Sequence, residues 1–217
     1  MESRHRPRLL IADDHKLVAE ACKGLLEPEF DVIALVPDGR ALLEAAAELR
    51  PDVVILDIAM PELNGLDAGE QIKHQNRSTK LIYLTMTLDP EVAAEAFRRG
   101  ASGYVLKQCN AEELVIAVRR VLRGESYLSP LITKDTVEFL LRSGATYQEE
   151  KRISSRQSEV LQLLAEGKTM KEIAYILKLK TGTVAFHKYR IMDVLGIKTT
   201  AALIEYAIRH HVIASTK

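Results

Sequence analysis

The stretch VVILDIAMPELNGL, residues 53–66, begins with four consecutive apolar residues and continues into a carboxylate and a loop. A short continuous apolar run is typical of a strand buried on both faces of a parallel sheet, because strands with one solvated face alternate apolar and polar residues. Asp57 follows the run directly, and Pro61 marks the loop beyond it. We therefore expect a buried strand over 53–56 that carries Asp57 at its carboxyl end.

Further apolar runs alternate with helical segments on both sides of this stretch. The other runs cover residues 9–12, 32–36, 81–84 and 104–106. The helical segments cover about residues 15–26, 38–49, 64–75, 89–99 and 110–123, and several are rich in strong helix formers. Five alternations of strand and helix predict an α/β domain with a doubly wound, five-stranded parallel sheet.

Polar side chains stand where four of these strands should end. They are Asp13 and Asp14 after the first strand, Asp57 after the third, Thr85 after the fourth and Lys107 after the fifth. Ligands of open parallel sheets bind beyond the carboxyl ends of the strands, so these residues should converge on one pocket. Clustered carboxylates need a cation to remain ionised together. Mg²⁺, which prefers oxygen ligands, suits three carboxylates and a backbone carbonyl after Asp57, at Ala59.

This combination of residues predicts phosphoryl transfer. Asp57 is the expected nucleophile toward a phosphohistidine or a small phosphodonor. Lys107 would neutralise one phosphate oxygen, and the Thr85 hydroxyl would donate a hydrogen bond to another. Each residue also has an ordinary structural explanation, such as helix capping or a solvated surface, but the five positions together favour a site. A phosphatase is an alternative that needs a general acid two residues beyond Asp57, where Ala59 stands.

Length and charge point to two domains. A chain of 217 residues favours two modest domains over one. Residues 1–128 carry 16 basic and 21 acidic side chains, a net charge of −5, whereas residues 129–217 carry 14 and 9, a net charge of +5. Counterion release would reward a basic segment on nucleic acid. Cys22 and Cys109 lack metal-ligand spacing, and no apolar run is long enough to cross a bilayer, so we expect reduced thiols, no membrane contact and a cytoplasmic protein.

The second half shows only helical spacing. A possible helix over 131–141 leads into a polar linker over 142–151. Four helices are expected between residues 154 and 210, the third over 181–195 and the last over about 199–210. Thr169 with Glu172 forms a capping-box pattern at the start of the second helix. Short helices around a small core, with a tight turn over 178–180, predict a helix-turn-helix domain.

The first half resembles the receiver domains of two-component response regulators over residues 8–126. Stretches 9–17, 57–66 and 101–107 carry the resemblance. It implies a flavodoxin-like fold, a sensor histidine kinase as partner and specific roles for named residues. Asp13 and Asp14 would belong to the metal site, Asp57 would be phosphorylated, Thr85 and Tyr104 would form a switch pair, and Lys107 would contact phosphate.

Residues 155–213 resemble the LuxR-type output domain of regulators of the NarL and FixJ kind. Stretches 159–168, 171–174 and 195–197 carry this resemblance, together with Thr183, Val184 and His187. It implies a DNA-binding domain over 152–217, joined to the receiver by a linker over 127–151. The third helix would enter the major groove of promoter DNA, and the fourth would contribute to a homodimer that forms on phosphorylation.

One departure from that family concerns the surface that would read the DNA. The helix face opposite the core carries Gly182, Ala185, Phe186, Tyr189 and Asp193, where relatives usually place a Lys or Arg. The predicted DNA contacts are Lys178, Lys180, Thr181, Thr183, Ala185, Phe186, Lys188, Tyr189 and Arg190. Flanking bases suit phosphates, and an uncharged centre suits thymine methyls or a contact by the Tyr189 hydroxyl. Alternatively, DNA binding is weak or lost, and the receiver acts through protein contacts.

Overall fold

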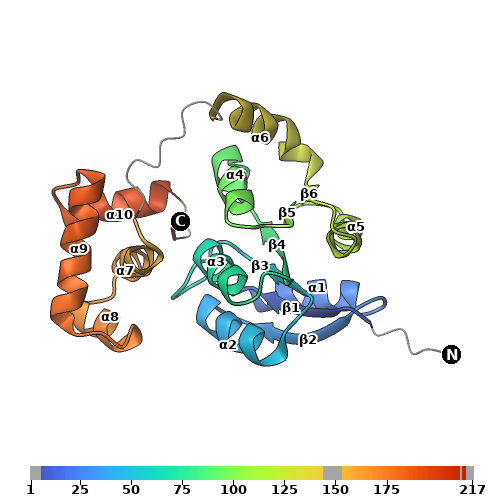
Figure 1. The fold of residues 1–217 in the computed structure, drawn as a ribbon, viewed down its shortest axis with the longest axis horizontal. Coiled ribbons are helices and arrows are strands. Elements are labelled where there is room, and N and C mark those ends of the chain that lie inside the picture. Colours follow the sequence, from blue (N-terminus) through green and yellow to red (C-terminus); the bar gives the residue numbers. More distant parts are fainter. Residues whose placement is uncertain (1–5, 144–152, 211, 214–217) are drawn as a thin grey trace.

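A six-stranded parallel sheet forms the centre of the N-terminal half in the computed structural model, which describes residues 6–143, 153–210 and 212–213 (Figure 1). The strand order is β2-β1-β3-β4-β5-β6. The strands are β1 (Arg8–Ala12), β2 (Asp31–Val36), β3 (Val53–Leu56), β4 (Lys80–Thr85), β5 (Gly103–Leu106) and β6 (Tyr127–Leu128). The parallel α/β architecture is confirmed, but the predicted count of five strands is one too low. The additional strand, β6, has only two residues, too few to stand out as an apolar run, and it pairs with β5.

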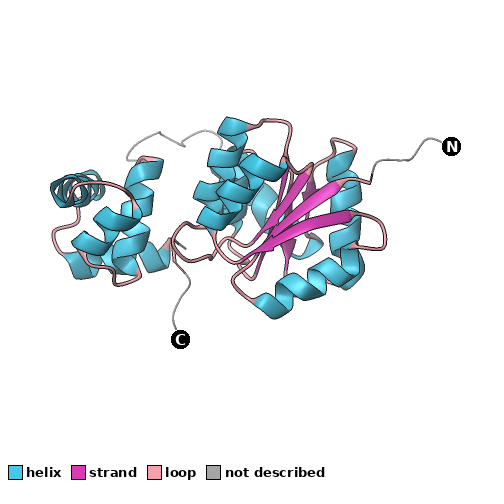
Figure 2. Ribbon diagram, turned by 90° about the horizontal axis from the view of Figure 1, so that it is seen from below, coloured by secondary structure: helices cyan, strands magenta, loops and turns pink. Residues whose placement is uncertain are grey.

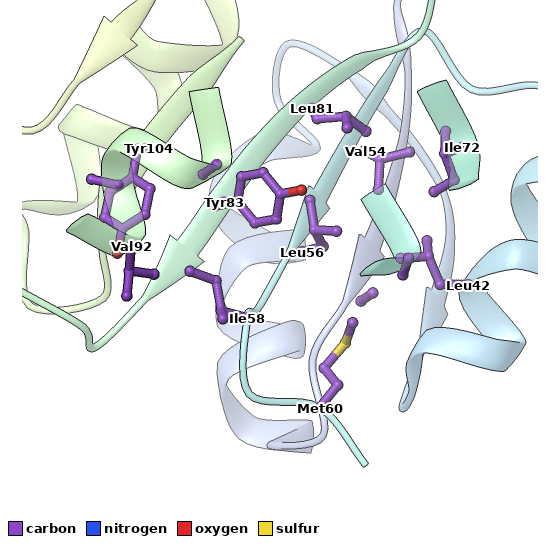
Figure 3. Packing of buried hydrophobic residues seen from close by; sticks show 14 of the residues in the cluster. Leu42, Val54, Leu56, Ile58, Met60, Ile72, Leu81, Tyr83, Val92 and Tyr104 are labelled. Carbon is purple, nitrogen blue, oxygen red and sulfur yellow. The ribbon is translucent and has the colours of Figure 1, made fainter. Parts of the chain in front are cut away.

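Helices cover both faces of the sheet (Figure 2). They are α1 (Lys16–Leu26), α2 (Gly39–Leu49), α3 (Gly65–Gln75), α4 (Pro90–Arg98) and α5 (Ala111–Leu122). Alternate residues of each strand enter opposite cores, because successive side chains point to opposite faces. Leu9 and Ile11 pack with α1 and α5. Leu10 and Ala12 belong to the core on the side of α2, α3 and α4, part of which Figure 3 shows.

The predicted helix over 131–141 is present as α6 (Pro130–Ser143). It lies against α4, and its Ile132 is 1% exposed within the core beneath that helix (Figure 1). Helix α6 therefore still packs on the N-terminal half of the chain. The rest of the predicted linker, residues 144–151, lies outside the described residues.

Four helices form the C-terminal half: α7 (Ser155–Ala165), α8 (Met170–Ile176), α9 (Thr181–Leu195) and α10 (Thr200–Arg209). Their core includes Val184, Ile191 and Leu203, each 0% exposed. The capping box between Thr169 and Glu172 is present at the start of α8. The four predicted helices and the turn between the second and third are thus confirmed. Among the described residues, no helix combines the length and apolar character that crossing a membrane requires.

Candidate functional site

Four polar residues stand together at the carboxyl ends of β1, β3, β4 and β5. The strand register brings them together: the Asp57 amide donates to the Ala12 carbonyl at 2.9 Å, and the Lys107 amide donates to the Thr85 carbonyl at 2.8 Å. Asp13, Asp57 and Thr85 are 4%, 5% and 2% exposed. We call Asp13, Asp57, Thr85 and Lys107 the phosphoacceptor pocket, after the role that the sequence predicts for Asp57. The predicted convergence of these strand ends is thus what the structure shows.

Lys107 joins the two buried carboxylates of the pocket. Its Nζ atom lies 2.6 Å from Asp57 Oδ2 and 2.7 Å from Asp13 Oδ2. Burial lowers the pKa of Lys107, but the ion pairs with Asp57 and Asp13 outweigh burial and leave that pKa above its ordinary value. The ammonium therefore stays charged at neutral pH and compensates charges that the protein interior would otherwise disfavour.

Carboxylates gather at the mouth of the pocket in a way that suits a hard cation. Asp13, Asp14, His15 and Asp57 each offer a ligand atom, and these atoms lie within 4.8 Å of one another. Asp14 and His15 are exposed, and His15 Nδ1 lies 2.8 Å from Asp14 Oδ1. Three carboxylates, of which Asp14 is exposed to solvent, match the oxygen-rich, partly hydrated coordination of Mg²⁺. Ala59 lies in the loop that begins at Asp57, close in sequence to this acidic pocket.

Tyr104 and the segment after β4 are connected beside the pocket. Tyr104 is 0% exposed, and its hydroxyl donates to the Thr87 carbonyl at 2.9 Å. Burial raises the pKa of Tyr104 above its ordinary range, so the hydroxyl remains a donor. The Thr87 amide lies 3.3 Å from Thr85 Oγ1. A change in the contacts of the Thr85 hydroxyl would therefore reach Tyr104 through one residue, Thr87.

Gly65 is a site residue that the sequence reasoning missed. A Cβ atom at Gly65 would lie 2.0 Å from the Asp57 carbonyl oxygen, so only glycine allows this approach of α3 to Asp57. The Gly65 amide donates to the Ile58 carbonyl at 2.8 Å and closes the loop that follows Asp57. The only signal in the sequence was a glycine eight residues after Asp57. The requirement for glycine comes from a contact that sequence spacing does not reveal.

The surface predicted to contact DNA lies on α9 and the turn before it. Its outer face, formed by Gly182, Ala185, Phe186, Tyr189 and Asp193, includes two large exposed rings: Phe186 is 66% exposed and Tyr189 is 64% exposed. Of the predicted contacts, Lys178, Lys180, Thr181 and Arg190 are also exposed, whereas Thr183, Ala185 and Lys188 are half-buried. Arg190 Nη1 lies 3.0 Å from Asp193 Oδ2. Part of the positive charge on this helix is therefore already neutralised.

His187 is a packed residue of α9. It is half-buried, and its ring packs edge to face on Phe186 with 5.8 Å between ring centroids. Its Nδ1 atom is buried without a hydrogen-bond partner. On α10, Leu203 and Ala207 face the core while Ile208 is 38% exposed, so this helix is apolar on more than one side.

Comparisons with known proteins agree with both halves of the chain. Residues 9–119 match the model of the response regulator receiver domain, and residues 151–207 match that of bacterial regulatory proteins of the luxR family. The oxygen regulatory protein NreC of Staphylococcus aureus is 36% identical over 210 residues, which cover 93% of this chain and 97% of NreC.

Solved structures of response regulators share the fold. RcsB of Salmonella enterica serovar Typhimurium, bound to a promoter with the phosphomimetic BeF₃⁻, has a TM-score of 0.63 and 30% identity, covering 94% of this chain and 99% of RcsB. A LuxR-family two-component regulator of Aurantimonas sp. SI85-9A1 has a TM-score of 0.60 and 31% identity, covering 63% of this chain and 99% of its own. With a receiver domain followed by a LuxR-type domain, this chain belongs to the NarL/FixJ type of two-component response regulators, which control transcription.

Proposed function

We propose that Asp57 is the phosphoacceptor and that its phosphorylation controls DNA binding by α9. The contact of Lys107 with both Asp57 and Asp13 carries this proposal. It holds a cation beside Asp57, the buried carboxylate that follows β3. An Asp57 oxygen attacks the phosphorus of a phosphohistidine on the partner kinase. The new O–P bond forms as the P–N bond breaks, and the imidazole leaves with the electron pair.

Asp13, Asp14, Asp57 and the Ala59 carbonyl are the residues proposed to hold Mg²⁺. The acidic cluster at the mouth of the pocket supports this set. Bound there, the ion would neutralise charge on the transferring phosphoryl group. Asp13 and Asp57 share Lys107 in this structure, so a divalent cation and the ammonium would together balance the three carboxylates before transfer and most of the charge of Asp13, Asp14 and the phosphoryl group after it.

Thr85, Lys107 and Tyr104 are the proposed switch. The Thr85 hydroxyl and the Lys107 ammonium would each contact a phosphate oxygen. Thr85 would then exchange its contact with Thr87 for one with phosphate, and the Tyr104 hydroxyl, bonded to the Thr87 carbonyl, would respond. Phosphate thus stabilises the arrangement of β4, β5 and the following loops in which Thr85 and Lys107 contact it and Tyr104 has moved. Phosphorylation would therefore shift the population between two states.

Labelling by acetyl phosphate tests the role of Asp57. The wild-type chain with Mg²⁺ should acquire one acid-stable, base-labile phosphoryl group, and Asp57→Asn should acquire none. Asp31→Asn is the matched control, because Asp31 is an exposed aspartate at the start of β2. Labelling of Asp57→Asn at the wild-type level would remove Asp57 from the proposal, and removal of Mg²⁺ by chelation should stop labelling of the wild type.

The proposed output is binding of double-stranded promoter DNA, at a site with two-fold symmetry, by a homodimer. Exposed Lys178 and Lys180 flank the start of α9, where they can reach phosphates while Phe186 and Tyr189 face bases. RcsB, 28% identical to this chain, has been solved as two dimers bound to two parallel DNAs. The proposed units are the receiver at 8–126, the linker at 127–151 and the DNA-binding domain at 152–217, acting in the cytoplasm.

The uncharged centre of the outer face of α9 would also suit binding to a protein. The salt dependence of binding distinguishes DNA binding from that alternative. Binding to a library of promoter fragments should weaken steeply as salt rises, because phosphate contacts release counterions. Beryllofluoride with Mg²⁺ should tighten that binding. Affinity for DNA that neither falls with salt nor responds to beryllofluoride would favour the protein-binding alternative.

A further inference from the structure

Gln162 on α7 and Glu166, which caps the carboxyl end of that helix, bind the backbone of the loop that follows Asp57. The Gln162 Nε2 donates to the Met60 carbonyl at 2.9 Å, and the Asn64 amide donates to Gln162 Oε1 at 2.7 Å. The Glu62 amide donates to Glu166 Oε1 at 3.0 Å. Gln162 Nε2 also lies 2.8 Å from that same Glu166 oxygen. Two neighbouring side chains at the end of α7 thus bind backbone groups at three alternate positions of the loop, Met60, Glu62 and Asn64.

These contacts are buried and are flanked by an ion-paired rim. Gln162 is 0% exposed and Asn64 is 4% exposed. Beside them, Arg40 on α2 lies 3.2 Å from Glu159 on α7 and 3.6 Å from Glu62 in the loop. A buried amide that gives and receives backbone hydrogen bonds fixes the distance and direction of both partners, since neither can turn to water.

The loop needs this support because its backbone is unusual. Glu62 has a φ of 63°, in the left-handed region that L-residues rarely adopt. The hydrogen bond from its amide to Glu166 holds it there. Within the loop itself, the Met60 amide bonds to the Ile58 carbonyl at 3.1 Å, and the Leu63 amide bonds to the Pro61 carbonyl at 2.7 Å. The Met60 carbonyl and the amides of Glu62 and Asn64 are bound instead by Gln162 and Glu166.

The position of the loop matters to the phosphoacceptor pocket. Asp57 precedes the loop directly, and the Ala59 carbonyl, the proposed fourth ligand of Mg²⁺, belongs to the same peptide unit as the Met60 amide. Gln162 holds the carbonyl of Met60, one peptide further along. Fixing that carbonyl restricts the rotation of Met60 and so restricts the direction in which the Ala59 carbonyl points.

We infer that Gln162 is a positioning residue for the phosphoacceptor loop, supplied by the DNA-binding domain, and that docking of α7 and binding of Mg²⁺ at Asp57 strengthen each other. The inference rests on the proposed function, in that it assumes the metal set of Asp13, Asp14, Asp57 and the Ala59 carbonyl. A loop already held in place loses less conformational freedom when it binds the ion. Thermodynamic linkage requires the reverse effect to be equal, so the ion must tighten the contact between the domains.

The docked arrangement leaves the outer face of α9 exposed. Phe186 and Tyr189 are more than half exposed while Gln162 is fully buried against the loop. Tightening the α7 contact would therefore fix the orientation of α9 relative to the receiver without covering it. The state of Asp57 would then affect DNA binding by changing how rigidly α9 is held relative to the receiver.

The experiment compares the full chain with Gln162→Ala, using Lys168→Ala as the matched control because Lys168 follows α7 and is exposed. Calorimetric titration with Mg²⁺ alone should give a dissociation constant about threefold to tenfold higher for Gln162→Ala than for wild type and Lys168→Ala. Hydrogen exchange without metal should show faster exchange at Glu62 and Asn64 in Gln162→Ala only. In the wild type, Mg²⁺ should slow exchange along α7.

An equal or lower dissociation constant in Gln162→Ala, with wild-type far-ultraviolet circular dichroism, would overturn the inference. If Gln162→Ala does not fold, Glu166→Ala replaces it, because Glu166 is half-buried and binds only the Glu62 amide within the loop. It should raise the dissociation constant in the same direction by a smaller factor. Absence of Mg²⁺ binding by the wild type would instead refute the proposed metal set, which keeps the two failures distinct.

Discussion

Lys107 in the phosphoacceptor pocket has a side chain that is 9% exposed and paired with two carboxylates, whereas Tyr189 on α9 is 64% exposed. The pocket is made by strand ends that the sheet holds in register, so its geometry exists before any ligand arrives. The outer face of α9 belongs to a single helix, and its contacts form only when a partner binds. A buried site of this kind constrains which residues it accepts far more tightly than an exposed face does.

Removing the central cation should produce the largest effect. Lys107→Ala takes away the charge between Asp13 and Asp57 and a group that would stabilise the transferring phosphoryl oxygens. Labelling by acetyl phosphate should slow by about 100-fold, the scale measured when one such electrostatic contact is lost. The metal-free protein should also lose about 3–5 kcal/mol of unfolding free energy, because two buried carboxylates are left uncompensated.

The matched control is Lys80→Ala, at the opposite end of β4, which should label normally. Mg²⁺ should restore part of the stability lost in Lys107→Ala, as measured by urea unfolding with and without the ion, since a cation can replace some of the missing charge. Wild-type labelling kinetics in Lys107→Ala would show that the pocket does not depend on its ammonium.

A glycine pair tests how tightly the pocket is packed. Gly65→Ala places a Cβ 2.0 Å from the Asp57 carbonyl oxygen, so α3 or Asp57 must move. We expect a loss of about 3 kcal/mol in unfolding free energy and a labelling rate roughly tenfold lower. Gly24→Ala, within α1 and with nothing inside 4 Å of its added Cβ, should gain about 0.5–1 kcal/mol and label normally. Equal urea midpoints for the two variants would contradict the tight packing.

The same contrast explains what could be predicted from the sequence. Asp57, Thr85 and Lys107 were identifiable because each ends an apolar run, and the topology of a parallel sheet then dictates that they meet. Strand β6 was missed because two residues show no periodicity. Gly65 and Gln162 were missed because their roles depend on contacts with backbone atoms elsewhere in the chain. Gly65 approaches Asp57, eight residues away, and Gln162 binds backbone groups about 100 residues away. No local sequence pattern encodes such contacts.

The helix-turn-helix half shows the opposite balance. Its helices follow from caps and apolar spacing, and α9 begins and ends at the predicted residues. Its function depends on a partner that the chain does not contain, so neither the sequence nor the fold selects which exposed residues touch bases. The pairing of Arg190 with Asp193 shows this, because a predicted DNA contact already has a partner within its own helix.

The smallest effect is expected on the outer face of α9, where single side chains can be exchanged without disturbing a core. Tyr189→Ala should weaken binding to a selected specific site by roughly tenfold, since a good base contact contributes about 1–3 kcal/mol of discrimination. It should leave binding to unrelated DNA nearly unchanged. Tyr189→Phe, which keeps the ring, should behave like the wild type if apolar contact reads the base and like Tyr189→Ala if the hydroxyl does.

Lys178→Gln provides the matching test of phosphate contact from the same surface. Lys178 is exposed in the turn before α9, so losing its charge should weaken specific and unrelated DNA equally and lower the salt slope by about one. Fluorescence anisotropy over a range of salt concentrations measures both effects. If instead Tyr189→Ala weakened all DNA equally while Lys178→Gln changed only the specific site, the two roles would be reversed. Sequence would then be read from the turn, and the aromatic centre of α9 would serve only to hold the helix against the groove.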